Sequence, residues 1–216
     1  MPAKDFVHLH VHTQYSLLDG AIRLDALIDR AKSFGMDTLA ITDHGTMFGT
    51  LDFFQKAVKA DITPNIGCEC FLAPRRLTDK TPMDSRGMRH LILLAENQEG
   101  YRNLCRLATM AQLKGFYYTP RIDREALQAH SKGLIAMSAC LHGEIPKLIT
   151  SGRQDEADKA AQYYQKLFGE KNFFLEVQHN GIPEQEIVNQ ALLDMSRRLS
   201  IPMTATNDCH YLDKTD

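Results

Sequence analysis

Three histidines lie two residues apart near the start of the chain, at His8, His10 and His12. Side chains alternate between the faces of a β-strand, so this spacing predicts three imidazoles on one face, with the intervening valine and leucine residues on the other. Burying several imidazoles on an apolar strand is costly unless they bind something. Because neutral imidazole is a common metal ligand, the spacing favours a metal site.

Other residues with metal-ligating side chains fall mostly at the ends of segments that read as strands. In a parallel α/β barrel the carboxyl ends of the strands converge on one face, where such proteins build their sites. We therefore expect two of the three histidines to join these residues in one cluster. The nine candidate metal ligands are His10, His12, Asp19, His44, Glu69, His90, Cys140, Asp208 and His210.

Nine ligands exceed what one four-coordinate ion needs, so the sequence predicts two or three divalent metal ions. The three carboxylates, an ionised thiolate and a bridging hydroxide would nearly balance the charge of three such ions. The mixed nitrogen, oxygen and sulfur ligands favour zinc, with manganese or iron as alternatives. Multinuclear sites of this kind cleave phosphoesters with a metal-bound hydroxide as the nucleophile, so we expect no catalytic residue separate from the ligands.

Composition sets limits on the whole chain. The 216 residues are 44% hydrophobic and 24% charged, which is typical of a single soluble domain, and the net charge of −2 provides no global attraction for nucleic acid. Without a signal peptide or an apolar run of membrane length, we expect a cytoplasmic protein with no membrane partner. Five irregularly spaced cysteines do not suggest a disulfide framework. We expect four of them to be small core residues, namely Cys68, Cys70, Cys105 and Cys209.

Hydrophobic patterning predicts alternating strands and helices. We expect seven strands, at 6–13, 38–44, 66–72, 90–95, 133–140, 173–179 and 202–210. Helices are expected at 24–35, 50–60, 99–114, 124–129, 154–168 and 184–199. This alternation predicts an α/β fold with a parallel sheet, closed or nearly closed into a barrel, and a doubly wound open sheet is the alternative. No glycine-rich phosphate-binding motif follows the first expected strand.

Several of these motifs resemble the PHP (polymerase and histidinol phosphatase) domain family. They are His10-Val-His12-Thr, Thr42-Asp-His44-Gly, Glu69, His90 and Asn207-Asp-Cys-His210. Longer stretches at 6–20, 115–123, 138–146 and 205–211 are similar to the N-terminal domain of the bacterial C-family replicative DNA polymerases, the DNA polymerase III alpha subunits. The resemblance implies a distorted seven-stranded (β/α)7 barrel, TIM-like, with a trinuclear metal centre. It also implies that residues 1–216 are one PHP domain, an N-terminal fragment of a much longer polymerase chain.

The resemblance carries the metal role to the same nine residues and gives none to His8, which we place behind the ligands on the same face. Cys140 stands where phosphatase-type members usually have histidine, and is similar to the metal-binding polymerase members. Three further residues follow or end strand-like segments and are candidates for substrate binding at the rim, namely Arg121, His142 and His179. For each of them, a solvated loop position is an equal alternative.

Two functions are compatible with this resemblance. The first is a metal-dependent 3′–5′ exonuclease that proofreads during DNA replication, with the 3′ end of the primer strand as substrate. The second is a metal-stapled structural and docking module that supports the rest of the polymerase chain and binds a separate proofreading exonuclease subunit, or other replisome subunits, at the nucleoid. A free-standing histidinol-phosphate phosphatase is a weaker third alternative, because the stretches around Tyr117 and Cys140 are of the polymerase type.

Overall fold

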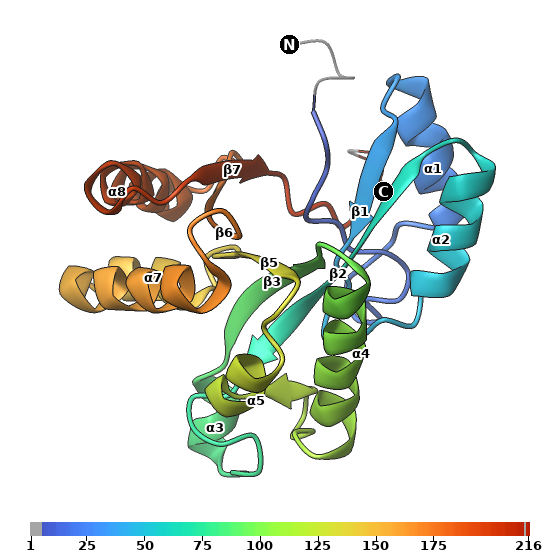
Figure 1. Cartoon of the computed structure of the whole chain (residues 1–216). Helices are drawn as coiled ribbons and strands as arrows, with labels where there is room; N and C mark the ends of the chain where they lie inside the picture. Colours follow the sequence, from blue (N-terminus) through green and yellow to red (C-terminus); the bar gives the residue numbers. More distant parts are fainter. Residues whose placement is uncertain (1–5, 214) are drawn as a thin grey trace.

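The computed structural model describes residues 6–213 and 215–216, and shows strands and helices that alternate along the chain (Figure 1). The strands are β1 (Thr38–Ile41), β2 (Thr63–Leu72), β3 (Arg89–Ala95), β4 (Arg121–Ile122), β5 (Leu134–Met137), β6 (Phe173–Gln178) and β7 (Met203–Thr206). The helices are α1 (Leu24–Ser33), α2 (Thr50–Lys59), α3 (Pro82–Arg86), α4 (Gln98–Leu113), α5 (Arg124–Ala129), α6 (Glu144–Thr150), α7 (Gln154–Phe168) and α8 (Pro183–Leu199).

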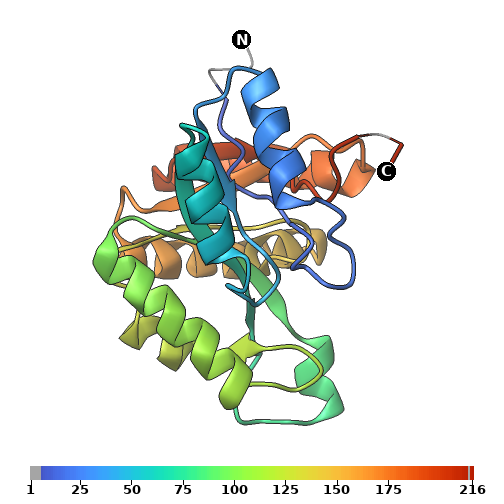
Figure 2. The same cartoon turned by 90° about the vertical axis from the view of Figure 1, so that its right-hand side faces the viewer.

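The strands form one curled, seven-stranded sheet in the order β1-β2-β3-β5-β6-β7, with β4 paired to β2. The sheet makes a half-barrel whose outer side carries the helices, with α1 and α2 beside β1 and β2 and with α7 and α8 near β6 and β7 (Figures 1 and 2). The expected α/β fold with a distorted, TIM-like barrel is therefore confirmed, in a form that is not fully closed. No helix in the described part of the chain has the length and apolar character needed to span a membrane.

The sheet is mixed, whereas the sequence predicted a parallel one. β3 runs antiparallel to both of its neighbours, β2 and β5, and its first residues lie opposite the last residues of β2. The reason is the connection between β2 and β3, in which a loop and the short helix α3 return the chain to the same end of the sheet, without a crossover helix of full length. This reversal matters for the site, because it brings the start of β3 to the edge where the other strands end.

The first expected strand, at 6–13, was wrong as a ladder strand. This segment is extended and lies between the ends of β1 and β7, where Ala40 N–H and Thr42 N–H donate to the carbonyls of His8 and Val11. Val11 forms an isolated bridge with Cys209. The seventh strand of the sheet is instead the two-residue β4, which the sequence did not predict, and neither were α3 and α6.

Side chains of β2 and β3 alternate between the inside and the outside of the half-barrel. Cys68 and Cys70 belong to the large core cluster between the sheet and the helices, whereas Glu69, between them in sequence, faces the interior. The thiols of Cys68 and Cys70 are therefore core groups, as predicted. Inside the barrel, Ile92 and Met137 belong to a smaller apolar cluster.

Candidate metal centre

The nine predicted ligands lie together at the end of the half-barrel where β1, β2, β5 and β7 terminate. Glu69 lies on β2 and His90 at the beginning of β3, whereas the others come from the extended N-terminal segment, the loop after it, or the segments that follow β1, β5 and β7. Each of the nine is within 4 Å of at least one other member, and these contacts connect them into one cluster. The nine residues therefore converge at one end of the fold, as expected from the sequence.

The deepest part of the cluster contains His10, His12, Glu69 and Asp208. The Nε2 atom of His10 lies 3.0 Å from His12 Nε2 and 3.1 Å from both Glu69 Oε2 and Asp208 Oδ1. His12 Nε2 is 3.2 Å from the same Asp208 oxygen. Two ring nitrogens and two carboxylate oxygens thus face one point, and both imidazoles are fully buried.

A second group joins the first through His12. Its ring lies against His44 and His210, with centroid separations of 4.0 and 4.2 Å. The partly exposed carboxylate of Asp19 is 3.4 Å from His44 Nε2 and 3.9 Å from His210 Nε2. This group of three imidazoles and one carboxylate is closer to solvent than the first group.

Glu69 connects the groups because its two oxygens face different partners. Oε2 faces His10, whereas Oε1 is 2.6 Å from His44 Nδ1 and 2.8 Å from His90 Nδ1. The antiparallel register places His90 opposite Phe71, two residues beyond Glu69 on β2. Had β3 run parallel, as predicted, its first residue would have started at the far end of the sheet.

The third group consists of His90, Cys140 and His142. Cys140 Sγ lies 3.8 Å from His90 Nδ1 and 3.9 Å from His142 Nδ1. The ring of His142 stacks on that of His90 with a centroid separation of 5.2 Å. His142, predicted as a substrate contact, therefore lies among residues with metal-ligating atoms.

Glu176 is a functional candidate that the sequence reasoning missed. It lies on β6 with no exposed surface, and its Oε1 accepts a 2.6 Å hydrogen bond from His10 Nδ1. Gln178 and Thr206 donate to the same oxygen. Because the Nδ1 proton of His10 is engaged with Glu176, the Nε2 atom is oriented toward the cluster. The available signal was a carboxylate in the middle of the apolar strand Phe173-Phe-Leu-Glu-Val-Gln178.

Ser16 and Asp43, also missed, orient His12 in the same way. The Ser16 hydroxyl donates to Asp43 Oδ1 at 2.8 Å, so it can only accept from His12 Nδ1, which is 3.0 Å away. His12 consequently presents Nε2 to the cluster. Asp43 is itself fixed by the backbone N–H and the hydroxyl of Thr13. No pattern in the sequence indicated that Asp43, next to the candidate ligand His44, would support His12.

His8 does not share the face of His10 and His12, contrary to the prediction. The chain bends at His10, and the His8 ring instead packs edge-on against Phe6, with Nδ1 3.6 Å from Cys209 Sγ. Burial lowers the pKa of His8. The alternation of faces fails here because residues 6–9 lie outside any continuous ladder.

Two segments of the cluster have backbone conformations that residues other than glycine rarely adopt. Ala139, directly before Cys140, has φ of 64°, and Asp208 has φ of 50°. Left-handed conformations of non-glycine residues cost free energy and persist only where the surrounding structure imposes them. In both cases the unusual turn directs a potential ligand into the cluster.

Opposite charges shift the pKa values within the cluster. Burial alone would lower the pKa of His10, but the carboxylates of Glu176 and Asp208 outweigh it and raise this pKa well above its usual value. Burial would likewise raise the pKa of Asp208, yet His10 and His12 hold it at about 2. The Asp208 carboxylate is thus stabilised in its ionised form beside these two imidazoles, and a bound cation would stabilise it in the same way.

Cys140 differs, because the net effect of its surroundings disfavours the thiolate. Burial raises the pKa of this thiol, and the charges of Glu69 and Asp208 raise it further. Only a strong local positive charge, such as a metal ion, would ionise it.

The donor set fits a group of divalent metal ions. Asp208 Oδ1 is buried yet makes no hydrogen bond, although it points at two imidazole nitrogens. An unpartnered buried carboxylate oxygen is costly, and a cation at this point would satisfy it together with the nitrogens. The supporting hydrogen bonds of His10 and His12 turn their Nε2 atoms inward, toward the position that such a cation would take.

Arg121 does not occupy the rim position that was predicted. Its side chain is fully buried, and its guanidinium donates to the carbonyls of Gly115, Leu77 and Asp79. It therefore fixes loops instead of facing a substrate. His179 is 90% exposed and pairs with Glu186 at 3.2 Å. No contact in the described residues joins it to the cluster.

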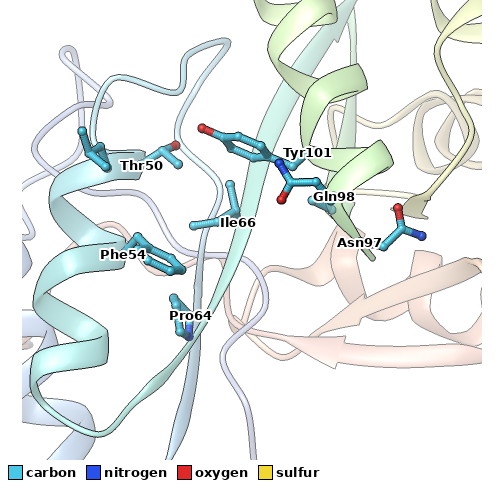
Figure 3. Close-up of a pocket in the computed structure, with 9 residues that line it drawn as sticks. Thr50, Phe54, Pro64, Ile66, Asn97, Gln98 and Tyr101 are labelled. Carbon is cyan, nitrogen blue, oxygen red and sulfur yellow. The ribbon is translucent and has the colours of Figure 1, made fainter.

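An apolar groove of about 320 Å³ lies at the opposite end of β2 and β3 from the cluster. Figure 3 shows Phe54 of α2 and Tyr101 of α4 on either side of Ile66 of β2. The residues lining it include none of the nine candidate ligands. The apolar groove is therefore separate from the candidate metal centre.

Comparison with known families assigns the chain to one of them. Residues 8–180 match the model of the PHP domain. The chain belongs to the PHP domain family. Its PHP domain is 46% identical over 212 residues to the DNA polymerase III subunit alpha of Borreliella burgdorferi, covering 98% of this chain and 18% of that protein. It is 47% identical over 218 residues to that of Treponema pallidum, covering 100% and 18%. The chain thus spans less than a fifth of the length of these curated relatives.

Two solved structures share the fold of this chain. A Bifidobacterium adolescentis protein assigned to the metal-dependent phosphoesterases superposes with a TM-score of 0.56 at 16% identity, covering 95% of this chain and 87% of that one. An amidohydrolase from Chromobacterium violaceum gives a TM-score of 0.58 at 15% identity, covering 94% and 87%. At these identities the likeness extends to the fold.

Proposed function

We propose that this PHP domain is a multinuclear metal-dependent phosphoesterase in a bacterial DNA polymerase III alpha chain, and that it removes nucleotides from the 3′ end of DNA during replication. The observation that carries this proposal is the completeness of the cluster. Nine potential ligands converge, and the inward nitrogens of His10 and His12 are each held in place by a hydrogen bond on the other side of the ring.

In this proposal the ligands are His10, His12, Asp19, His44, Glu69, His90, Cys140, Asp208 and His210, and two or three ions, zinc by preference, occupy the cluster. Such ions activate water and neutralise the developing charge of a phosphodiester. Glu69 connects the positions through its two oxygens, while Glu176 and Ser16 keep His10 and His12 in the required orientation. The exposed side of the cluster, near Asp19 and His210, is where a strand end would enter.

The test uses the full-length polymerase chain, purified without chelators, and a DNA substrate labelled at its 5′ end. We expect two or three metal equivalents by mass spectrometry and shortening from the 3′ end. Asp208→Asn and His12→Ala should abolish the shortening while polymerisation continues. Fully metal-loaded protein without any 3′-end shortening would refute the exonuclease proposal.

The second candidate function, a metal-stapled docking module, also has a specific observation behind it. The cluster ties together segments that are 200 residues apart, His10 and His210, in a sheet that does not close by itself. In addition, Leu51 and Phe54 of α2 remain exposed by 67% and 48%. This function predicts a large loss of thermal stability on chelation without turnover, and a surface for the remaining polymerase or a separate exonuclease subunit.

Both functions place the domain at the start of a longer polymerase chain in the bacterial cytoplasm, working with the replisome on the nucleoid. Pull-down of the full-length chain with and without its first 216 residues would test the partner assignment. Unchanged recovery of replisome subunits after the deletion would argue against docking.

A further inference from the structure

His142 is the one member of the third group that is not among the nine predicted ligands. Its Nδ1 faces Cys140 Sγ at 3.9 Å, a distance nearly equal to the 3.8 Å between that sulfur and His90 Nδ1. The three ligating atoms lie within 4.8 Å of one another. A single cation could therefore contact all three after only a small contraction of the group.

The backbone holds His142 in place, although its side chain is exposed. The carbonyl of His142 accepts a 3.0 Å hydrogen bond from His90 N–H, and Gly143 forms a β-bridge with His90. Gly143 also packs so closely that a Cβ there would lie 2.1 Å from the Ser138 carbonyl oxygen. The segment from Ser138 to Gly143 is thus a tight turn with little freedom, and it presents Cys140 and His142 on the same side.

The chemistry of these donors differs from that of the rest of the cluster. His90 and His142 each offer an imidazole nitrogen, Cys140 offers sulfur, and Glu69 Oε1 lies 2.8 Å from His90 Nδ1. Two nitrogens, a sulfur and a carboxylate oxygen make a four-donor set of the kind that zinc favours. The other two groups contain only nitrogen and oxygen donors, and one of them includes the half-exposed Asp19.

We propose that His142 is a metal ligand and that it completes, with His90, Cys140 and Glu69, a closed four-donor zinc position within the cluster. The inference rests on the proposed metal centre and deepens it, since it makes the metal positions unequal. When zinc binds, the Cys140 thiol loses its proton to solvent and the sulfur–zinc bond forms. With four protein donors, this position has none left open for substrate, so its ion has a structural role and the ions at the other positions remain open to the phosphodiester.

The experiment measures metal retention and does not depend on activity. The purified chain is loaded with zinc, dialysed against a chelator for increasing times, and its zinc content is followed by mass spectrometry. We expect the wild type to keep one slowly released equivalent. His142→Ala should release this equivalent at least about tenfold faster, because losing a ligand should weaken zinc binding by no less than the roughly tenfold that losing an outer-shell partner costs. His142→Cys, which restores a zinc-ligating side chain, should keep it.

His179→Ala is the matched control, because His179 is an exposed histidine outside the cluster and should not alter retention. Cobalt substitution gives a second readout. The sulfur-to-cobalt charge-transfer band reports that Cys140 is bound, and the intensity of the ligand-field bands reports the coordination number. We expect His142→Ala to keep the sulfur band and change the ligand-field intensity, whereas Cys140→Ser should lose the sulfur band.

The outcomes separate the inference from the proposed function. Wild-type retention in His142→Ala would overturn the role of His142 while leaving the metal centre intact. Equal loss in His142→Ala and His142→Cys, with the fold preserved by circular dichroism, would also overturn it. A wild-type chain that binds no metal at all would overturn both proposals. A slow equivalent that is lost in the alanine variant and kept in the cysteine variant supports the assignment.

Discussion

Replacing Glu176 by glutamine tests whether the cluster depends on support from inside the barrel. The change keeps the size of the side chain and removes its negative charge. In the wild type, Glu176 Oε1 accepts from His10 Nδ1 at 2.6 Å, from Gln178 Nε2 at 3.1 Å and from the Thr206 hydroxyl. The side chain has no exposed surface, so water cannot take its place.

The size of the effect follows from the bond to His10. A hydrogen bond to a charged group contributes about 1.5–3 kcal/mol, and about 1.4 kcal/mol corresponds to a tenfold change in affinity. Glutamine can still accept through its amide oxygen, so we expect the lower part of this range. Metal affinity should fall by about tenfold, within the range of roughly 10–100-fold typical of outer-shell partners of ligating histidines.

The assay is a competition titration of zinc against a chromophoric chelator, with Glu170→Gln as the control because Glu170 is exposed. Nitrogen NMR signals of the His10 ring should show a change at Nδ1, which a general loss of stability would not produce. Unchanged zinc affinity in a folded Glu176→Gln variant would refute the reasoning that Glu176 orients His10.

Three further predictions concern stability. Gly100→Ala should lower the free energy of unfolding by about 1–3 kcal/mol, because the added Cβ would lie 1.6 Å from the Gly133 carbonyl oxygen. Urea unfolding should show a smaller loss for the control Gly87→Ala, where the atom nearest to the added Cβ is 3.1 Å away. The hydrogen bonds from Arg198 lower the pKa of Asp158 from 3.8, so this pair stabilises the fold above pH 3.8 and the stabilisation is lost as the pH falls through the lowered value. Asp158→Asn should therefore cost at most about 1 kcal/mol at neutral pH and nothing in strong acid, and an equal cost at both pH values would contradict this assignment. Adding zinc to the metal-free chain should raise the thermal midpoint, with a gain of about 2.7 kcal/mol for one site at a hundredfold excess over its dissociation constant, and no shift in scanning calorimetry would argue against binding.

The helices were largely predictable because their signals are local. α7 has the predicted bounds, and α8 begins at Pro183 as the proline at its first turn indicated. The alternation that places Glu69 inside and Cys68 and Cys70 outside was also predictable from the sequence. The short elements β4 and α3 were not, because two to five residues carry too little pattern to be distinguished from a loop.

The direction of β3 could not be read from its residues. A strand has the same alternation in either direction, and only the path of the 73–88 connection decides which end meets the cluster. The same limit applied to His8, whose spacing from His10 implied a shared face that the bend at His10 abolishes. The prediction that Arg121 lies at the rim was wrong for a similar reason. Two of the carbonyls that hold its buried guanidinium belong to Leu77 and Asp79, more than 40 residues away in the chain, so the sequence around Arg121 gives no sign of its burial.

The sequence by itself determined which residue types can ligate metal and that they fall at strand ends, because ligand chemistry and side-chain periodicity are properties of local sequence. Only the tertiary structure decided how those residues are used. The protonated nitrogen of His10 is set by Glu176, 166 positions away, and that of His12 by Ser16 and Asp43. His142 lies beside the cluster because its neighbour Gly143 forms a bridge with His90 of β3. Contacts of this kind depend on how distant segments pack, and no local pattern encodes them.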